Sequence, residues 1–158
     1  MMAKLVIQIY LSYSQLCVFL TSLTNPFNDW SDRSFSQGFS WRDGSVSFRA
    51  LREDGDHQIN LFIDEPIPGL VSNVQRAFRV PFETMDGHIE VASISDSACL
   101  EVPPGKYCLQ VEFLAVEDNG MPEVNVRLNK GGCGFELLKA DDQIVMEGEL
   151  DISAESAI

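Results

Sequence analysis

The side chains best able to do chemistry in this chain of 158 residues are carboxylates, and they are concentrated beyond residue 80. Residues 80–158 hold 16 acidic and four basic residues, whereas residues 1–79 hold eight acidic and seven basic residues. Five of these carboxylates fall within or beside two adjacent predicted strands and their turns: Glu83, Asp86, Glu90, Asp96 and Glu101. Carboxylates at alternate strand positions project from one face roughly 6.6–6.8 Å apart, close to the roughly 7 Å between phosphates along a nucleic-acid strand. We therefore take these five as the candidate contact set for a positively charged partner.

The formal net charge of −13 narrows the classes of partner. Proteins that bind nucleic acids neutralise phosphates with Lys and Arg, so direct binding of nucleic acid is disfavoured. Docking on an anionic membrane surface is disfavoured for the same reason. A basic protein or a cation is favoured as a partner, although acidity also serves solubility alone.

Catalytic and metal-binding motifs are scarce. The two histidines, His57 and His88, lie in different halves of the chain, and no cysteine pair has the spacing of a zinc site. The sequence has no phosphate-binding loop, dinucleotide-binding motif or nucleophile elbow. An enzyme that uses Cys133, in "GGCGF", or His88 stays as an alternative, but the sequence favours a protein without catalysis or cofactor.

Calcium is a second alternative, because acidic residues cluster in two predicted loops. Glu53, Asp54 and Asp56 occupy one loop, and the pair at 141–142 occupies another. Oxygen ligands from sandwich loops bind Ca²⁺ in some domains, but acidic turn residues usually bond their own backbone. We predict no metal site, and a calcium- or lipid-binding module remains a rival hypothesis.

The elements that must position these residues are strands. Apolar and polar residues alternate with a period of two, and Pro, Gly, Asn and Asp punctuate the alternation. The predicted strands are 4–10, 16–21, 45–51, 57–63, 74–82, 88–94, 107–116, 123–128 and 143–152. This pattern predicts an all-β fold, a two-sheet antiparallel β-sandwich of about 8–10 strands. We expect one domain over residues 1–158, with a frayed, flexible tail over 153–158.

The N-terminal segment and the cysteines bear on location. Residues 1–23 are interrupted by polar residues and alternate like strands, so they predict neither an export signal nor a membrane span. Cys17, Cys99 and Cys108 sit in apolar runs, which favours reduced thiols in a cytoplasmic protein. A bridge between Cys99 and Cys108, which flank one turn, is left open.

The stretch "NDWSDRSFSQGFSW" (28–41) holds both tryptophans among polar residues. It predicts a short helix over 31–37, with Asp29 as its N-cap and Gly38 as its left-handed end. Phe35 and Phe39 then lie one turn apart, with Trp30 at the entry. We interpret the stretch as a plug over an open end or edge of the sandwich, since large aromatic side chains usually serve burial.

Several segments resemble the competence protein J family, the DNA-entry nuclease inhibitors. They are "IYLSYSQLCVF" (9–19), "NDWSDRSFSQGFSWRDGSVSFRA" (28–50), "VPF" (80–82), "DGHIEVASI" (86–94) and "LEVPPGKYCLQV" (100–111). Within them the family signature falls on Asp29, Trp30, Asp32, Gly38, Asp43 and Gly44. The resemblance implies a protein that holds an endonuclease inactive by binding it, with no catalysis and no cofactor.

The resemblance covers residues 5–116 and leaves the rest of the chain open. An acidic inhibitor suits the basic DNA cleft of a nuclease, because opposite charges steer association. An immunity-type binding protein with a different partner is the alternative, because 117–158 have no counterpart in the resemblance. Homo-oligomerisation is a further possibility that the sequence leaves open.

Overall fold

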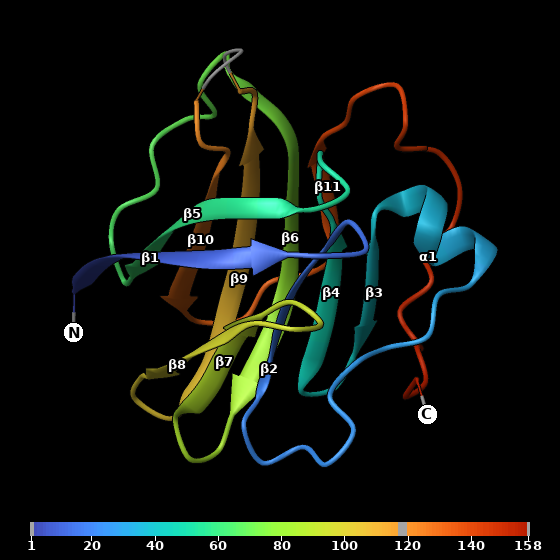
Figure 1. Ribbon diagram of the computed structural model, residues 1–158. Coiled ribbons are helices and arrows are strands. Elements are labelled where there is room, and N and C mark those ends of the chain that lie inside the picture. The colour runs from blue at the N-terminus through green and yellow to red at the C-terminus, as the bar shows by residue number, and fades with distance from the viewer. Residues whose placement is uncertain (1, 117–119, 158) are drawn as a thin grey trace.

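A computed structural model describes residues 2–116 and 120–157, which form two packed β-sheets and one short helix (Figure 1). In order across the six-stranded sheet, the strands are β1 (Ala3–Leu11), β5 (Gly55–Ile63), β10 (Glu123–Lys130), β9 (Gly105–Leu114), β6 (Val74–Thr84) and β11 (Glu136–Lys139). Across the five-stranded sheet they are β3 (Phe39–Arg42), β4 (Ser45–Arg49), β2 (Gln15–Leu20), β7 (His88–Ala92) and β8 (Ser97–Glu101). The all-β, two-sheet prediction is confirmed.

Strand pairing is mostly antiparallel, with one exception. β10 pairs with β5 in parallel, from Glu123 beside Gln58 to Leu128 beside Ile63. The purely antiparallel prediction is therefore wrong at this pair. β1 instead pairs with β5 antiparallel, so β5 joins strands of both directions within one sheet.

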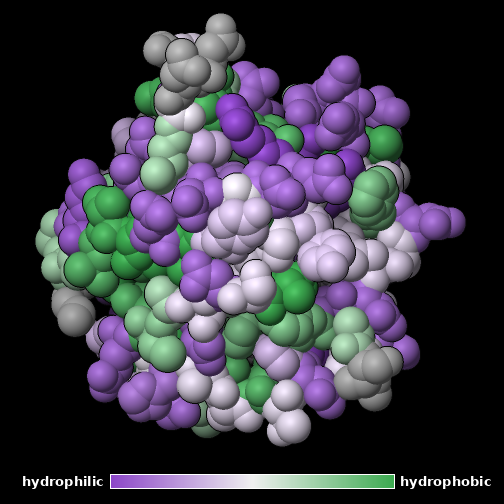
Figure 2. Space-filling view, viewed as in Figure 1, coloured by the Kyte–Doolittle hydropathy of each residue, from purple (hydrophilic) through white to green (hydrophobic). Residues whose placement is uncertain are grey.

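The core lies between the two sheets, because each strand turns alternate apolar residues inward. Phe39, Phe48, Phe78 and Phe113 are buried there, and Phe78 contacts each of the other three rings at centroid distances of 5.6–6.3 Å. Some hydrophobic side chains remain on the surface. Figure 2 shows them gathered at the left of the view, over the N-terminal part of β1.

Helix α1 (Asp32–Gln37) confirms the short helix predicted over 31–37. Its N-cap is Ser31, not Asp29, because Ser31 and Ser34 exchange side-chain and backbone hydrogen bonds as a capping box. Gly38 ends the helix with φ +96°, and a Cβ there would lie 2.7 Å from the ring of Phe78. That close approach is the physical reason for glycine at this position.

The plug interpretation holds for only part of the aromatic stretch. Phe39 lies in β3 rather than on the helix, and it is fully buried in the core. Trp41, also in β3, is half-buried against Phe135, at 4.9 Å between centroids. Phe35 is exposed instead and lies beneath the guanidinium of Arg49, at 3.8 Å. Two of the four aromatics thus belong to an edge strand and one faces outward.

The predicted strand over 143–152 is wrong. The segment is an irregular strap over α1, because side chains take the hydrogen bonds that a strand would offer. Arg33 donates to the carbonyls of Val145, Gly148 and Glu149, at 2.9–3.3 Å. Hydrogen bonds to Asp151 from Ser31 and then from Ser153 lower the pKa of that carboxyl below its ordinary value.

The frayed tail predicted over 153–158 does not match residues 153–157. The backbone N–H of Ala154 donates to Trp41, and that of Ala157 donates to Phe27. Asn28 and Ser156 also form an isolated antiparallel bridge. These backbone bonds tie the segment to the chain on either side of α1; residue 158 lies outside the described residues.

Two cysteine predictions need correction. Cys108, in β9, is bonded to Cys133, with 5.4 Å between their Cα atoms, so these two are not reduced thiols. A bridge between Cys99 and Cys108 is thereby excluded. Cys17 is buried as expected, but Cys99 is an exposed free thiol, because it lies on the outer face of β8.

Candidate partner-binding surface

The β7–β8 hairpin carries three of the five predicted contact residues. Leu100 of β8 and Ile89 of β7 are paired and buried, so their neighbours in the strands face outward. Glu90 lies beside Cys99 and Glu101 beside His88 on that outer face. Asp96 follows at the turn between the strands. The hairpin thus presents carboxylates from a two-stranded ribbon at the edge of the five-stranded sheet.

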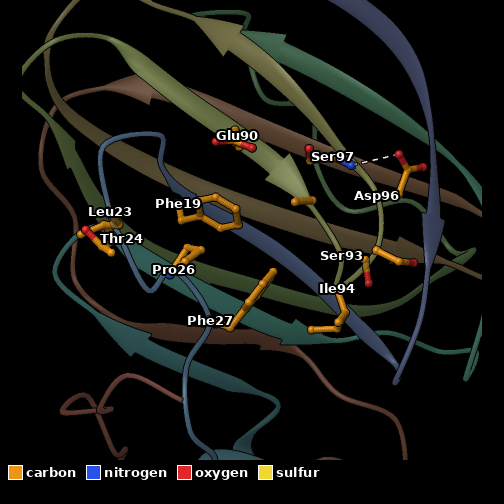
Figure 3. Close-up of a pocket in the computed structure, with 12 residues that line it drawn as sticks. Phe19, Leu23, Thr24, Pro26, Phe27, Glu90, Ser93, Ile94, Asp96 and Ser97 are labelled. Atoms are coloured by element: carbon orange, nitrogen blue, oxygen red, sulfur yellow. Dashed lines mark hydrogen bonds between the residues drawn. The ribbon is translucent and has the colours of Figure 1, made fainter. Parts of the chain in front are cut away.

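A groove of about 560 Å³ runs between this hairpin and the segment that links β2 to α1 (Figure 3). Its lining comprises Phe19, Leu23, Thr24, Pro26, Phe27, Glu90, Ala92, Ser93, Ile94, Ser95, Asp96 and Ser97. Two of the predicted contact residues, Glu90 and Asp96, therefore line one concave site. The aromatic and proline side chains of the groove project toward one another in Figure 3, with Glu90 on β7 above them.

The floor of the groove is apolar. The rings of Phe19 and Phe27 meet edge to face at 5.7 Å, and both pack with Cys17 and Ala92 in a small cluster outside the main core. Burial raises the pKa of the Cys17 thiol to about 11, so this cysteine stays protonated and serves packing. Sequence reasoning missed Phe19 and Phe27; "NPFN" before the helix was the available sign of a segment folded back on the sheet.

The two carboxylates of the groove differ in how they are held. Asp96 accepts hydrogen bonds from the backbone N–H of Tyr10, at 2.8 Å, and of Ser97, at 2.9 Å. It therefore fastens the hairpin turn to β1. Glu90 accepts no side-chain hydrogen bond or ion pair from the described residues, and it is partly exposed. Glu90 is thus the carboxylate of the groove that is available to another molecule.

The other two predicted residues, Asp86 and Glu83, lie beside the hairpin and form no single row with its carboxylates. Asp86 sits in the β6–β7 turn and accepts from the N–H of His88, at 2.9 Å. Gly87 beside it has φ +80°, and a Cβ would lie 2.0 Å from the carbonyl of Val102, so the turn requires glycine. Glu83 belongs to β6, in the other sheet, opposite Lys106. A row of evenly spaced charges, imitating phosphates, is therefore not what these residues form.

The electrostatic character of the hairpin is nevertheless one-sided. Residues 80–105 contain five acidic residues and no Lys or Arg. The ion pairs that the structure describes join Arg76 to Asp141, Arg79 to Glu136 and Arg127 to Glu112, none of which belongs to the contact set. The arginines of the first half do not neutralise the hairpin carboxylates within the described chain.

A second pocket, of about 520 Å³, lies near the β6 end of this surface. Glu83 lines it, together with Trp41, Asp43 and Gly44 from β3 and the turn after it. Its wall includes Cys133 of the disulfide and Met85, which is 84% exposed. This pocket places two residues of the family signature, Asp43 and Gly44, at the surface.

The remaining signature residues serve the α1 region. Asp32 is the acidic residue in the first turn of α1, where a negative charge favours the helix. The backbone of Asp29 donates to Glu155 and accepts from Ser40. Trp30 packs edge to face on Phe35, at 6.5 Å, and lines a third pocket with Tyr13 and Arg49.

The alternative sites, a catalytic Cys133 and a calcium site with Asp141 and Asp142, meet specific obstacles in the structure. Cys133 has no thiol to act as a nucleophile, because it is bonded to Cys108. Asp141 pairs with Arg76, which removes it from a calcium-binding pair with Asp142. Among the residues that the structure describes, no group of three or more His, Cys, Asp and Glu side chains could hold a metal ion. No helix in that part of the chain is long and apolar enough to cross a membrane.

Comparisons with known proteins agree on one family. The family model of competence protein J (ComJ) matches residues 8–129. The DNA-entry nuclease inhibitor of Bacillus subtilis (strain 168) is 28% identical over 103 residues, which are 65% of this chain and 76% of that protein. The crystal structure of ComJ from Bacillus subtilis, an inhibitor of the DNA-degrading activity of NucA, superposes with a TM-score of 0.73 at 23% identity, over 83% of this chain and 99% of that one.

A second solved structure has a similar fold. It belongs to the product of crocagin biosynthetic gene J and superposes with a TM-score of 0.56 at 16% identity. The alignment covers 81% of this chain and 98% of that chain. At such identity the likeness concerns the fold alone.

Proposed function

Because the chain belongs to the competence protein J family, we propose that it is a non-enzymatic inhibitor that binds a DNA-degrading endonuclease and holds it inactive. The relative in Bacillus subtilis is a DNA-entry nuclease inhibitor, and the ComJ whose structure is solved inhibits the nuclease NucA. We propose that the enzyme inhibited by this chain is a nuclease of the same kind as NucA.

The groove beside the β7–β8 hairpin is the proposed contact site. The single observation that carries this choice is the unpaired carboxylate of Glu90 above the apolar floor made by Phe19 and Phe27. Lys and Arg have long apolar stems and charged ends, so they pack on aromatic rings while the charge reaches a carboxylate. Such residues are abundant where a nuclease must bind DNA phosphates.

Inhibition follows from competition in this proposal. A basic side chain of the nuclease that enters the groove pairs with Glu90 and is withdrawn from DNA. Glu101 and Asp86 add negative potential on the same side and steer the nuclease toward the hairpin. The protein thereby needs no metal, cofactor or reactive group of its own.

A cleavage assay with two matched variants tests the proposal. The wild-type protein, mixed in excess with its nuclease, should suppress DNA cleavage. Glu90→Lys should weaken inhibition by about a hundredfold, because reversal of a charge in a contact costs several kcal/mol. Glu147→Lys, the same change at an exposed residue on the strap over α1, should leave inhibition unchanged.

Two results would contradict different parts of the proposal. Undiminished cleavage at excess wild-type protein, with no complex in gel filtration, would reject the inhibitor function. Inhibition that survives Glu90→Lys as well as it survives Glu147→Lys would reject the groove while leaving the function intact. An immunity-type protein for another enzyme would form no complex with the nuclease but would bind its own target.

The place of action also belongs to the proposal. The sequence predicts the cytoplasm, but disulfides persist mainly in oxidising surroundings. The Cys108–Cys133 bond therefore favours an oxidising environment over the cytoplasm for the working protein. When cysteines are alkylated in intact cells before extraction, Cys108 and Cys133 should be protected. Modification of both would instead support a cytoplasmic location.

A further inference from the structure

The four edges of the two sheets differ in how well they are protected. Short edge strands, bulges and charges normally prevent an edge from pairing with another chain. β3 and β11 have four residues each and β8 has five, and the pairing of β11 is broken by a register shift. β1 has nine residues in continuous register with β5 and one charged residue, Lys4. β1 is therefore the edge that is open to pairing.

The free backbone groups of β1 follow from one hydrogen bond. The N–H of Tyr10 donates to Asp96, so it points away from β5. Residues of an antiparallel strand alternate in direction, with both backbone groups of each residue on the same side. The N–H and C=O groups of Lys4, Val6 and Gln8 consequently point outward along the edge. Asp96 closes the edge at Tyr10 and leaves these three residues open.

Two exposed side chains in and beside the open stretch are apolar, whereas Lys4 and Gln8 are exposed and polar. Val6 is 58% exposed and Leu5 is 46% exposed, and Figure 2 shows the hydrophobic patch over this part of β1. An extended edge with exposed apolar residues is a typical pairing site. The ammonium of Lys4, the one charged side chain of β1, lies over the ring of Phe62 in β5, at 5.4 Å. It therefore packs against the neighbouring strand.

We propose that β1 pairs antiparallel with β1 of a second copy of this chain, about a two-fold axis at Val6. In that register Lys4 faces Gln8 of the partner subunit and Val6 faces Val6 of the partner subunit. All three outward-facing residues then exchange both backbone hydrogen bonds, and Asp96 lies just beyond the paired stretch. The two six-stranded sheets become one continuous sheet, with an isologous interface.

Charge favours a second copy over a nuclease at this edge. Residues 1–28 contain no Asp or Glu. When β1 of one copy pairs with β1 of another, no two carboxylates of this segment therefore face each other and repel. The same absence gives a basic protein nothing to be attracted to here. The carboxylates of residues 80–105 attract such a partner elsewhere on the molecule.

Sedimentation equilibrium over a concentration series tests the dimer. The wild-type chain should sediment as a dimer. Val6→Lys and Val6→Glu should each be monomeric, because like charges face each other at the axis. Their equimolar mixture should recover the dimer, because the charges become opposite. Met85→Lys, at an exposed apolar residue far along the chain in the β6–β7 turn, should remain dimeric.

A cross-link tests the register without relying on weakened variants. Val6→Cys in a Cys99→Ser background should oxidise to a covalent dimer, because hydrogen-bonded antiparallel pairs hold their Cα atoms about 5.5 Å apart, within disulfide range. A monomeric wild type, a dimer that survives both charged variants, or a mixture that stays monomeric would overturn the proposal. Loss of nuclease binding in both charged variants of a monomeric chain would assign the edge to the nuclease instead.

Discussion

The side chain of Arg76, in β6, links the end of β4 to the segment that follows β11. It is 1% exposed and donates to Asp141 at 2.9 Å, to the carbonyls of Arg49 and Ala50, and to Gln143. A buried guanidinium is tolerated only when its donors are satisfied. The strap that follows β11 therefore owes its position to a residue 65 positions earlier in the sequence.

Arg76→Met should lower the free energy of unfolding by about 3 kcal/mol, because it leaves Asp141 and the carbonyls of Arg49 and Ala50 without their donor. Urea denaturation measures the change. Arg79→Met is the matched control, since Arg79 pairs with Glu136 where both side chains are partly exposed, and such pairs are worth about 1 kcal/mol or less. Equal losses of stability in the two variants would show that the buried Arg76 contributes no more to stability than the partly exposed Arg79.

At this scale the sequence predicted part of the site. The concentration of carboxylates is visible from composition, and Glu90 and Asp96 do line one groove. Which of them is free could not be foreseen, since Asp96 is occupied by the backbone of Tyr10, 86 residues away. The same holds for Phe19 and Phe27, whose contact depends on a segment folding back over the sheet.

Among the elements, the disulfide decides how the β10–β11 connection is placed. Cys133 follows β10 and is bonded to Cys108 in β9. Close after the bond, Phe135 stacks on Phe39 at 6.2 Å, and its ring meets Trp41 edge to face. The bond closes a loop over a sequence separation of 25, which is worth about 3 kcal/mol if it acts on the unfolded chain.

Thiol titration should follow from the burial of each cysteine. In the folded protein one thiol, the exposed Cys99, should react rapidly. Cys17 should react only after unfolding, because it is buried and its pKa of about 11 leaves it protonated up to strongly alkaline pH. Reduction should add the thiols of Cys108 and Cys133 and lower the melting temperature.

Two single substitutions separate these effects. Cys133→Ser should lower the melting temperature of the unreduced protein to that of the reduced one. Cys99→Ser should leave the melting temperature unchanged and remove the rapid thiol. Three thiols that titrate rapidly in the folded, unreduced protein would contradict the disulfide, and four would contradict the burial of Cys17 as well.

Strands were predictable where alternation and burial coincide. The run 107–116 anticipates β9, because its inward residues Leu109, Val111 and Phe113 are all buried. Alternation over 143–152 misled, since Met146 is 51% exposed and Arg33 takes the carbonyls that a neighbouring strand would have used. β11 was missed because four residues, "ELLK", are too few to show a period.

For the molecule as a whole, the charge should govern how fast a nuclease is captured. A net charge of −13, concentrated in the second half, attracts a basic protein over distances that salt screens. The association rate constant should fall about tenfold or more between low and high ionic strength, whereas the dissociation rate changes less. Stopped-flow mixing measures both, and an association rate independent of salt would refute electrostatic capture.

The parallel pairing of β5 with β10 has a consequence for how the chain assembles. Every strand of the five-stranded sheet is complete by Glu101, so that sheet has its members early in synthesis. The six-stranded sheet stays in two pieces, β1–β5 and β6–β9, until β10 arrives to lie between them. Contacts this distant in sequence close slowly. A late step of assembly is then the insertion of β10 between two strand pairs, β1–β5 and β6–β9, each of which is already formed.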